Sequence, residues 1–137
     1  MALGGAERRT GKILIVDDDP VTADLLRLSL EVEGHEVRTA AEGLEGVELA
    51  RAFHPDVALV DILMPGLDGY AVASAMRRDL GQAVAIIALT GLPERRARCL
   101  VSGFNLHLRK PVPLATIRDI IRALLEGRPA LEGSATA

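Results

Sequence analysis

Several residue types are scarce in this chain of 137 residues, and each shortage excludes a class of protein. Tryptophan is absent and the aromatic residues are only Phe53, Tyr70 and Phe104, so the core has to be aliphatic. The single cysteine, Cys99, excludes an internal disulfide and favours a reducing, cytoplasmic location. No apolar run approaches the roughly 20 residues that a membrane span needs, so we expect no membrane insertion.

Excess positive charge is missing as well. The formal net charge of −3 argues against a non-specific nucleic-acid binder, and we expect no direct contact with nucleic acid. Residues 1–12 are polar and contain glycine, so no signal peptide is visible and a cytoplasmic chain is expected. The length fits one domain with a single well-buried core.

Short apolar runs alternate with amphipathic stretches along the chain. The runs are residues 12–16, 36–39, 56–60, 84–89 and 105–108. The first, third and fourth are nearly continuous, as in parallel strands that are covered on both faces, whereas the second and fifth contain polar residues, which suits sheet edges. In the fifth run, Asn105 and His107 alternate with Leu106 and Leu108, so one face is expected to be wetter.

The amphipathic stretches predict helices. Asp19 can cap a helix that begins at Pro20, and an apolar stripe of this helix comprises Val21, Leu25, Leu28 and Val32. Further helices are predicted over 42–53, after a cap at Asp68, over 93–103, and from Pro113, whose core face would hold Leu114, Ile117, Ile121, Leu124 and Leu125.

Strict alternation of strand and helix predicts an α/β protein. We expect a flavodoxin-like, doubly wound (βα)5 fold, in which a five-stranded parallel sheet of order 2-1-3-4-5 carries helices on both faces. Residues 12–126 would form this domain, between disordered tails at 1–11 and 127–137. Ligands of such sheets bind at the carboxyl ends of the strands, where the strand order reverses between the first and third strands.

Acidic residues stand at that position on both strands. Asp17, Asp18 and Asp19 directly follow the first strand, and Asp61 follows the third. Like charges at the mouth of an apolar sheet are costly unless a cation neutralises them. Magnesium is the candidate, because it binds proteins through one or two carboxylates together with water and phosphate oxygens.

Two further residues mark the ends of the later strands. Thr90 follows the fourth strand, and Lys110 follows the fifth. Lysine is rare here: among 16 basic residues, only Lys12 and Lys110 are lysines. A lysine supplies a compact charge on a flexible stem, which suits a carboxylate or phosphoryl oxygen.

The combination resembles the receiver domains of two-component response regulators, across residues 12–126. The resemblance rests on Val-Asp-Asp after the first strand, on Asp61 in Val-Asp-Ile-Leu-Met-Pro-Gly-Leu-Asp-Gly, on Thr90 in Leu-Thr-Gly and on Lys110-Pro111. Each motif is weak alone, but all four occur in order at successive strand ends. The stretch 103–111 is more similar to standalone receivers, or to those of hybrid histidine kinases, than to receivers fused to DNA-binding domains.

The resemblance implies a phosphoacceptor in a phosphorelay rather than an enzyme acting on other substrates. Asp61 would accept the phosphoryl group from a phosphohistidine of a sensor histidine kinase or phosphotransfer protein. Asp18 and Asp61 would bind Mg2+ directly with the Leu63 carbonyl, and Asp17 would act largely through water. A downstream protein target would read the phosphorylated state.

The resemblance also implies roles for the later strand ends. Thr90 would hydrogen-bond one phosphoryl oxygen and Lys110 would pair with another, with Thr90 also serving as a switch residue. Receivers often carry Tyr or Phe three residues before the lysine as the second switch residue, and His107 occupies that position here. An imidazole is planar and could move in the same way.

Two other families share parts of the pattern. Residues 17–21 fit the Asp-x-Asp-x-Val motif of haloacid-dehalogenase-type phosphatases, with Asp17 as nucleophile. That site also needs an acidic pair after Lys110, for which the remaining chain has little room, and it leaves Asp61 without a role. A flavin-binding module needs a hydroxyl- and glycine-rich loop after the first strand, where three carboxylates would repel phosphate.

Overall fold

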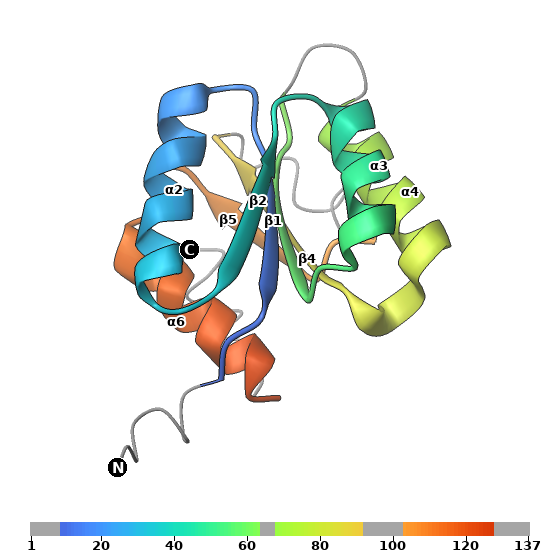
Figure 1. The fold of residues 1–137 in the computed structure, drawn as a ribbon. Coiled ribbons are helices and arrows are strands. Elements are labelled where there is room, and N and C mark those ends of the chain that lie inside the picture. The colour runs from blue at the N-terminus through green and yellow to red at the C-terminus, as the bar shows by residue number, and fades with distance from the viewer. Residues whose placement is uncertain (1–8, 64–67, 92–102, 128–137) are drawn as a thin grey trace.

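The computed structural model describes residues 9–63, 68–91 and 103–127 and contains a five-stranded parallel sheet (Figure 1). The strands are β1 (Lys12–Val16), β2 (Glu36–Ala40), β3 (Val57–Asp61), β4 (Ala85–Thr90) and β5 (Leu106–Arg109). Their order is β2-β1-β3-β4-β5, which confirms the predicted order and places β2 and β5 at the edges.

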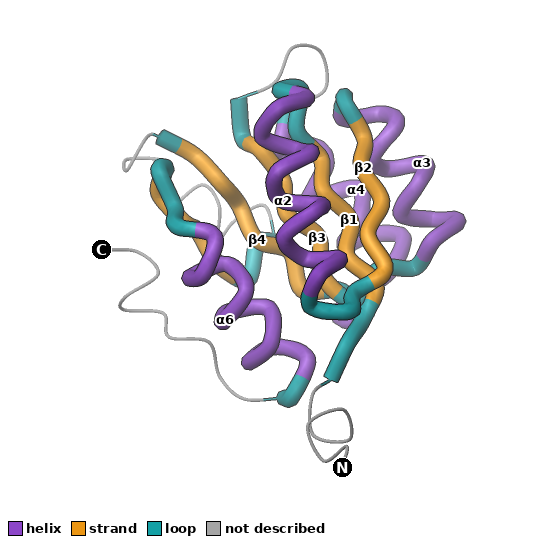
Figure 2. The backbone as a smooth tube through the Cα atoms, turned by 60° about the vertical axis from the view of Figure 1, so that its left-hand side comes forward, coloured by secondary structure: helices purple, strands orange, loops and turns teal. Residues whose placement is uncertain are grey.

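Helices cover both faces of this sheet. They are α2 (Pro20–Val32), α3 (Gly43–Phe53), α4 (Gly69–Leu80), the 3-10 turn η1 (Gly81–Ala83) and α6 (Leu114–Leu125). Figures 1 and 2 show α2 and α6 on one face of the sheet and α3 with α4 on the other. None of the described helices is long and apolar enough to cross a bilayer. The predicted helix over 93–103 and most of both predicted tails lie outside the described residues.

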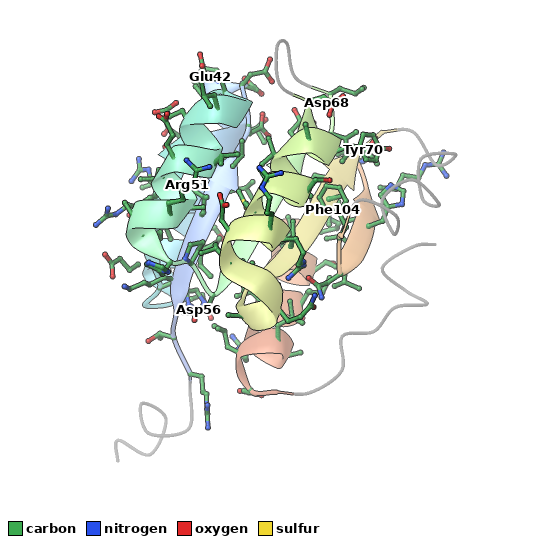
Figure 3. The ribbon with its side chains drawn as sticks, turned by 90° about the vertical axis from the view of Figure 1, so that its right-hand side faces the viewer. Glu42, Arg51, Asp56, Asp68, Tyr70 and Phe104 are labelled. Carbon is green, nitrogen blue, oxygen red and sulfur yellow. The ribbon has the colours of Figure 1, made fainter. Side chains whose placement is uncertain are left out.

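Alternation along the strands divides the core into two layers. Ile13 and Ile15 of β1 pack with α2 and α6, whereas Leu14 and Val16 pack with α3 and α4. Every residue of β3 is buried, as expected of a central parallel strand that is covered on both faces. On the α4 side, Tyr70 and Phe104 meet edge to face with ring centroids 6.1 Å apart (Figure 3). Burial on both faces therefore holds the strand ends in register.

Both predicted helix caps are confirmed. Asp19 accepts a hydrogen bond from the backbone N–H of Val21 at the start of α2. Asp68 accepts one from the N–H of Ala71, 3.0 Å away, at the start of α4. Each cap satisfies a backbone donor that the first turn of a helix leaves without a partner. The caps thereby determine where the loops after β1 and β3 end.

The apolar stripe predicted for the first helix does lie on one helix, α2, but it faces away from the sheet. The four stripe residues Val21, Leu25, Leu28 and Val32 are all exposed. The helix packs instead through Ala23, Leu26 and Leu30. The helix therefore has two apolar stripes. The stripe of Ala23, Leu26 and Leu30 packs on the sheet, because the small Ala23 side chain allows close approach.

Two smaller expectations hold only in part. On the face of β5 expected to be wetter, Asn105 and Arg109 are exposed, but His107 between them is buried with 6% exposure. In α6, Leu114 is 39% exposed, while Ile120, which was not predicted, is buried. Leu114 lies in the first turn of its helix, beyond the part that packs on the sheet.

Candidate functional site

The parallel register brings the predicted site residues to one edge of the sheet. Val16 pairs with Val60, so Asp17 and Asp61 leave neighbouring strands at the same height. Thr90, the last residue of β4, pairs with Arg109, which places Lys110 beside it. The Lys110 N–H donates to the Thr90 carbonyl oxygen over 2.7 Å, so the loop after β5 is attached to the end of β4.

Three carboxylates converge at this edge. One oxygen from each of Asp17, Asp18 and Asp61 lies within 4.8 Å of the other two. Asp17 and Asp61 are buried, whereas Asp18 is exposed. Asp17 is held by its own backbone N–H, which donates to the Ala40 carbonyl, and by the Asp19 N–H, which donates to its Oδ1 over 2.9 Å. The predicted acidic cluster is therefore present and geometrically tight.

Lys110 supplies the positive charge at this site. Its Nζ lies 3.6 Å from Asp61 Oδ1 and 3.9 Å from Asp17 Oδ2. Both distances exceed a charge-assisted hydrogen bond, which is typically about 2.7–2.9 Å long. Among the described residues, one lysine thus faces two buried carboxylates and a third exposed one, and these residues leave the negative charge incompletely compensated.

Burial without full compensation changes the acidity of both inner carboxylates. Desolvation raises the pKa of Asp17 and of Asp61 above the ordinary value for aspartate, and the Lys110 ammonium only partly opposes this. Asp17 Oδ2 is buried and accepts no hydrogen bond from any residue that the structure describes. A buried carboxylate oxygen in this condition fits a hard cation, which would favour the charged form of the cluster.

Leu63 lies next to the acceptor candidate. Its backbone N–H donates to Asp61 Oδ1 over 3.2 Å, and its side chain is 56% exposed. This hydrogen bond orients the Asp61 carboxylate from the loop that follows β3. The role of the Leu63 carbonyl as a metal ligand stays a prediction.

Gly69 is a position of close backbone approach beside the site, and sequence reasoning missed it. A Cβ atom at this position would lie 2.6 Å from the Asp61 carbonyl oxygen and 2.7 Å from the Ile62 Cα. The Gly69 N–H also donates to the Ile62 carbonyl over 3.2 Å. Only glycine lets the start of α4 approach the end of β3 this closely. The only sequence signal is a glycine directly after the cap at Asp68.

The two proposed switch positions are both buried. Thr90 is 1% exposed at the edge of the site, and His107 is 6% exposed on the neighbouring strand. His107 pairs with Ala88 and lies one layer deeper in the sheet than Thr90. The register therefore places Thr90 at the same edge of the sheet as the carboxylates and His107 further from that edge, and the switch role of each residue stays a prediction.

Comparisons with known proteins agree with this geometry. Residues 13–122 match the family model for the response regulator receiver domain. Protein PilH of Pseudomonas aeruginosa is 38% identical over 119 residues, which are 85% of this chain and 98% of PilH. The DNA-binding dual master transcriptional regulator RpaA of Synechocystis is 35% identical over 83% of this chain, and the chain spans about half of that protein (48%).

A solved structure shows the same fold with an occupied site. The receiver domain of sensor histidine kinase PA1611 from Pseudomonas aeruginosa carries a magnesium ion coordinated in its active site cleft. It matches 86% of this chain and 99% of its own chain with a TM-score of 0.77 and 33% identity. The phosphatase alternative finds no support in these matches, which run through β1, β3 and β4 alike. On its fold, its site and its relatives together, the chain belongs to the response regulator receiver domain family.

Proposed function

We propose that Asp61 is the residue of this receiver that accepts a phosphoryl group from a phosphohistidine. The observation that carries this proposal is the position of Asp61 between two other carboxylates and the Lys110 ammonium, at the point where the strand order reverses. Asp17 is less suited, because it is more deeply buried and one of its oxygens is held by the Asp19 N–H. Asp61 is also the carboxylate nearest to Lys110 Nζ.

In the transfer, an Asp61 carboxylate oxygen forms a bond to phosphorus while the bond from phosphorus to the donor imidazole nitrogen breaks. The electron pair of that bond stays on the imidazole, and the phosphoryl oxygens keep their negative charge. Lys110 pairs with one of these oxygens and the Thr90 hydroxyl donates to another. Such transfer depends on positioning and on charge neutralisation more than on a proton-transferring base.

The donor set fits Mg2+. Asp18 and Asp61 would hold the ion through carboxylate oxygens, with Asp17 acting largely through water and the Leu63 carbonyl as a further ligand. When bound, Mg2+ neutralises charge on the equatorial phosphoryl oxygens. The buried Asp17 oxygen without a hydrogen bond and the related receiver with a coordinated magnesium ion both support this assignment.

The partners follow from the class of reaction. The donor is a sensor histidine kinase or a phosphotransfer protein, and a downstream protein reads the phosphorylated state through changes that begin at Thr90 and His107. We assign this function to residues 12–126, in the cytoplasm and without direct contact to nucleic acid, in line with the negative net charge. Its chemistry is confined to its own phosphorylation and dephosphorylation.

Labelling with a small phosphodonor tests the assignment. Incubation with acetyl phosphate and Mg2+ is expected to give one base-labile acyl phosphate, identified at Asp61 by peptide mapping. Asp61→Asn removes the nucleophile but keeps the shape of the side chain, so it is expected to abolish the label and to leave the fold intact. Label that persists in this variant, or that maps to Asp17, would contradict the assignment.

A further inference from the structure

Arg77, in the last turn of α4, makes four hydrogen bonds through its two terminal nitrogens. Nη1 donates to the carbonyl oxygens of Gly81 and Val84, over 2.8 and 2.7 Å. Nη2 donates to the Gly103 carbonyl oxygen and to Asn105 Oδ1, over 2.7 and 2.8 Å. A planar guanidinium presents its hydrogens in a fixed fork, and a charged donor makes a stronger hydrogen bond than a neutral one. Arg77 therefore holds its acceptors in one fixed arrangement.

The acceptors of Arg77 belong to the starts of two neighbouring strands. Two of them precede β4 and two precede β5. Asn105 ties the same strands together a second time, because its N–H donates to the Ile86 carbonyl oxygen and its Oδ1 accepts from the Ile86 N–H, each over 2.7 Å. Gly103 presents its carbonyl oxygen to Arg77 from a φ of +94°, a conformation that favours glycine. The amino ends of β4 and β5 are therefore fixed to α4 and to each other.

Strand β5 needs such an anchor because it is a short edge strand. It has four residues, and in the described sheet it pairs with β4 alone. A slip by a whole residue would turn the buried Leu106 and Leu108 to the other face of the sheet, so core packing opposes it. Smaller displacements keep both side chains on the core face, so hydrogen bonds have to restrict them. Arg77 does so at the start of β5, and the bond from the Lys110 N–H to the Thr90 carbonyl oxygen does so beyond its end.

Helix α4 connects β5 to the strand that carries the proposed acceptor. Asp61 ends β3 and Lys110 follows β5, and β4 separates these two strands in the sheet. The start of α4 lies against the end of β3, where the Gly69 N–H donates to the Ile62 carbonyl oxygen over 3.2 Å. The end of α4 carries Arg77. One helix about 18 Å long, the yellow-green helix that lies over the sheet in Figure 3, therefore joins the end of β3 to the start of β5.

We propose that Arg77 is a positioning residue for phosphoryl transfer: by fixing the start of β5 to the end of α4, it holds Lys110 opposite Asp61. The inference rests on the proposed function, because Lys110 acts there through its contact with a phosphoryl oxygen. Lys110 Nζ lies 3.6 Å from Asp61 Oδ1, and a misplacement of about 1 Å can cost about 100-fold in rate. Arg77 lies at the opposite end of the strands, roughly 16 Å away along β4, so it acts only through the elements that it anchors.

A double-mutant cycle on the rate of labelling by acetyl phosphate tests this role. Arg77→Ala is expected to slow labelling about tenfold, and Lys110→Ala is expected to slow it as well. Because Arg77 acts through Lys110, adding Arg77→Ala to the Lys110→Ala chain is expected to slow labelling no further. Rates are compared at saturating Mg2+ and below the onset of unfolding. If the two effects multiply instead, Arg77 does not act through Lys110 and the inference is wrong.

A pair of substitutions at Asn105 tests the anchor even if Arg77→Ala does not fold. Asn105→Asp keeps an oxygen that accepts from both Arg77 and the Ile86 N–H, so it is expected to label like the parent chain. Asn105→Leu has a similar volume but no acceptor. It releases one hydrogen bond of Arg77 together with the bond from Ile86, so it is expected to slow labelling several-fold. Equal labelling rates in the two variants would contradict anchoring at the start of β5.

Hydrogen exchange separates positioning from a general loss of stability. The Lys110 N–H donates to the Thr90 carbonyl oxygen and reports on β5, whereas the Ile62 N–H donates to the Leu89 carbonyl oxygen and reports on β3. In Arg77→Ala, exchange of the Lys110 amide is expected to accelerate about tenfold more than exchange of the Ile62 amide, because opening is local to β5. Equal acceleration of both amides would mean that Arg77 only stabilises the domain as a whole, and would overturn the inference.

Arg51→Ala is the matched control. Arg51 Nε on α3 lies 2.7 Å from Asp79 Oδ2 on α4, so the exchange removes an ion pair of α4 that involves neither β4 nor β5 (Figure 3). Labelling and amide exchange are expected to match the parent chain, and slowing equal to that of Arg77→Ala would contradict a specific role for Arg77. Failure of the proposed function is recognised separately, as label that persists in Asp61→Asn or as an unchanged rate in Lys110→Ala. The exchange measurement requires no phosphorylation.

Discussion

Strand β3 carries an aspartate at each end, and the two behave in opposite ways. Asp56, just before the strand, accepts a hydrogen bond from the Lys12 N–H over 2.9 Å, and its own N–H donates to the Lys12 carbonyl. Figure 3 shows Asp56 at the end of the sheet opposite to Asp68. Asp61 ends the strand buried between other carboxylates. The first carboxylate stabilises the fold, and the second is the proposed phosphoacceptor.

The same contrast holds for basic residues. At the amino end of the sheet, the Arg77 guanidinium donates to the carbonyls of Gly81, Val84 and Gly103 and to Asn105 Oδ1, over 2.7–2.8 Å. At the carboxyl end, Lys110 Nζ stays at 3.6 and 3.9 Å from its carboxylates. The hydrogen bonds of Arg77 stabilise the fold, whereas the longer distances around Lys110 are typical of a site that binds a ligand.

The largest effect is expected from exchanging a carboxylate at each end for alanine. Asp18→Ala removes a proposed Mg2+ ligand and is expected to abolish both Mg2+ binding and labelling by acetyl phosphate. Asp56→Ala is the matched control at the other end: it loses the hydrogen bond from Lys12, costs about 1 kcal/mol of stability, and keeps full labelling. Mg2+ titration and urea unfolding measure the two effects. Equal Mg2+ affinity in Asp18→Ala would break the contrast between the ends.

The close approach at Gly69 sharpens the contrast further. Gly69→Ala forces its Cβ against the backbone of Asp61 and Ile62, so we expect a loss of about 1–3 kcal/mol, as for overpacked sites. Labelling is expected to slow as well, because the end of β3 has to move. Gly91→Ala, where no described residue lies within 4 Å of the added atom, is the control and is expected to change neither property. If the Gly69→Ala chain has the same stability and labelling as the parent, the backbone around Asp61 and Ile62 can move to accommodate the added Cβ without cost.

The pH dependence of stability is expected to differ in sign between the two ends. At the carboxyl end, the raised pKa of Asp61 means that the folded state holds its proton more tightly than the unfolded state. Metal-free stability therefore falls as the pH rises from the ordinary value of 3.8 through the raised pKa. At the amino end, burial lowers the pKa of His35, whose Nδ1 accepts from the Gly11 N–H, so its contribution rises with pH up to 6.5.

Thermal unfolding in a chelator, compared between the parent chain and Asp61→Asn, separates these opposing slopes. The free energy of unfolding of the parent minus that of the variant is expected to fall with rising pH. The His35 contribution is the same in both chains and cancels in this difference. Mg2+ at ten times its dissociation constant is expected to restore about 1.4 kcal/mol to the parent, and less to the variant. A difference that is flat with pH would mean that Asp61 is not desolvated.

The smallest effect concerns the lifetime of the phosphorylated form. The Leu63 side chain leaves the backbone beside the Asp61 carboxylate and cannot orient an attacking water. Leu63→Asn is expected to accelerate phosphoryl loss several-fold after removal of the donor, at constant Mg2+. Leu44→Asn, with the same 56% exposure at a distant helix, is expected to decay like the parent. Equal decay in all three chains would show that water access at residue 63 does not limit hydrolysis.

Much of the carboxyl end could be predicted from sequence because its signals are local. An apolar run followed at once by Asp17 and Asp18, another ending at Asp61, and single residues such as Thr90 and Lys110 after later runs identify strand ends directly. In a parallel sheet, strand ends share an edge, so the linear pattern already implies convergence. The caps at Asp19 and Asp68 were predictable for the same reason, since capping is a local hydrogen bond.

The sequence by itself therefore determined the fold class and the strand order and predicted the cluster of Asp17, Asp18 and Asp61, because hydrophobic periodicity and strand ends can be recognised from neighbouring positions. Only the tertiary structure decided which apolar stripe of α2 faces the sheet, since both stripes have helical spacing and close packing chooses between them. It also decided that Gly69 must lack a side chain and that His107 is buried. Those properties depend on contacts with segments that are distant in the sequence, so a short stretch of sequence cannot reveal them.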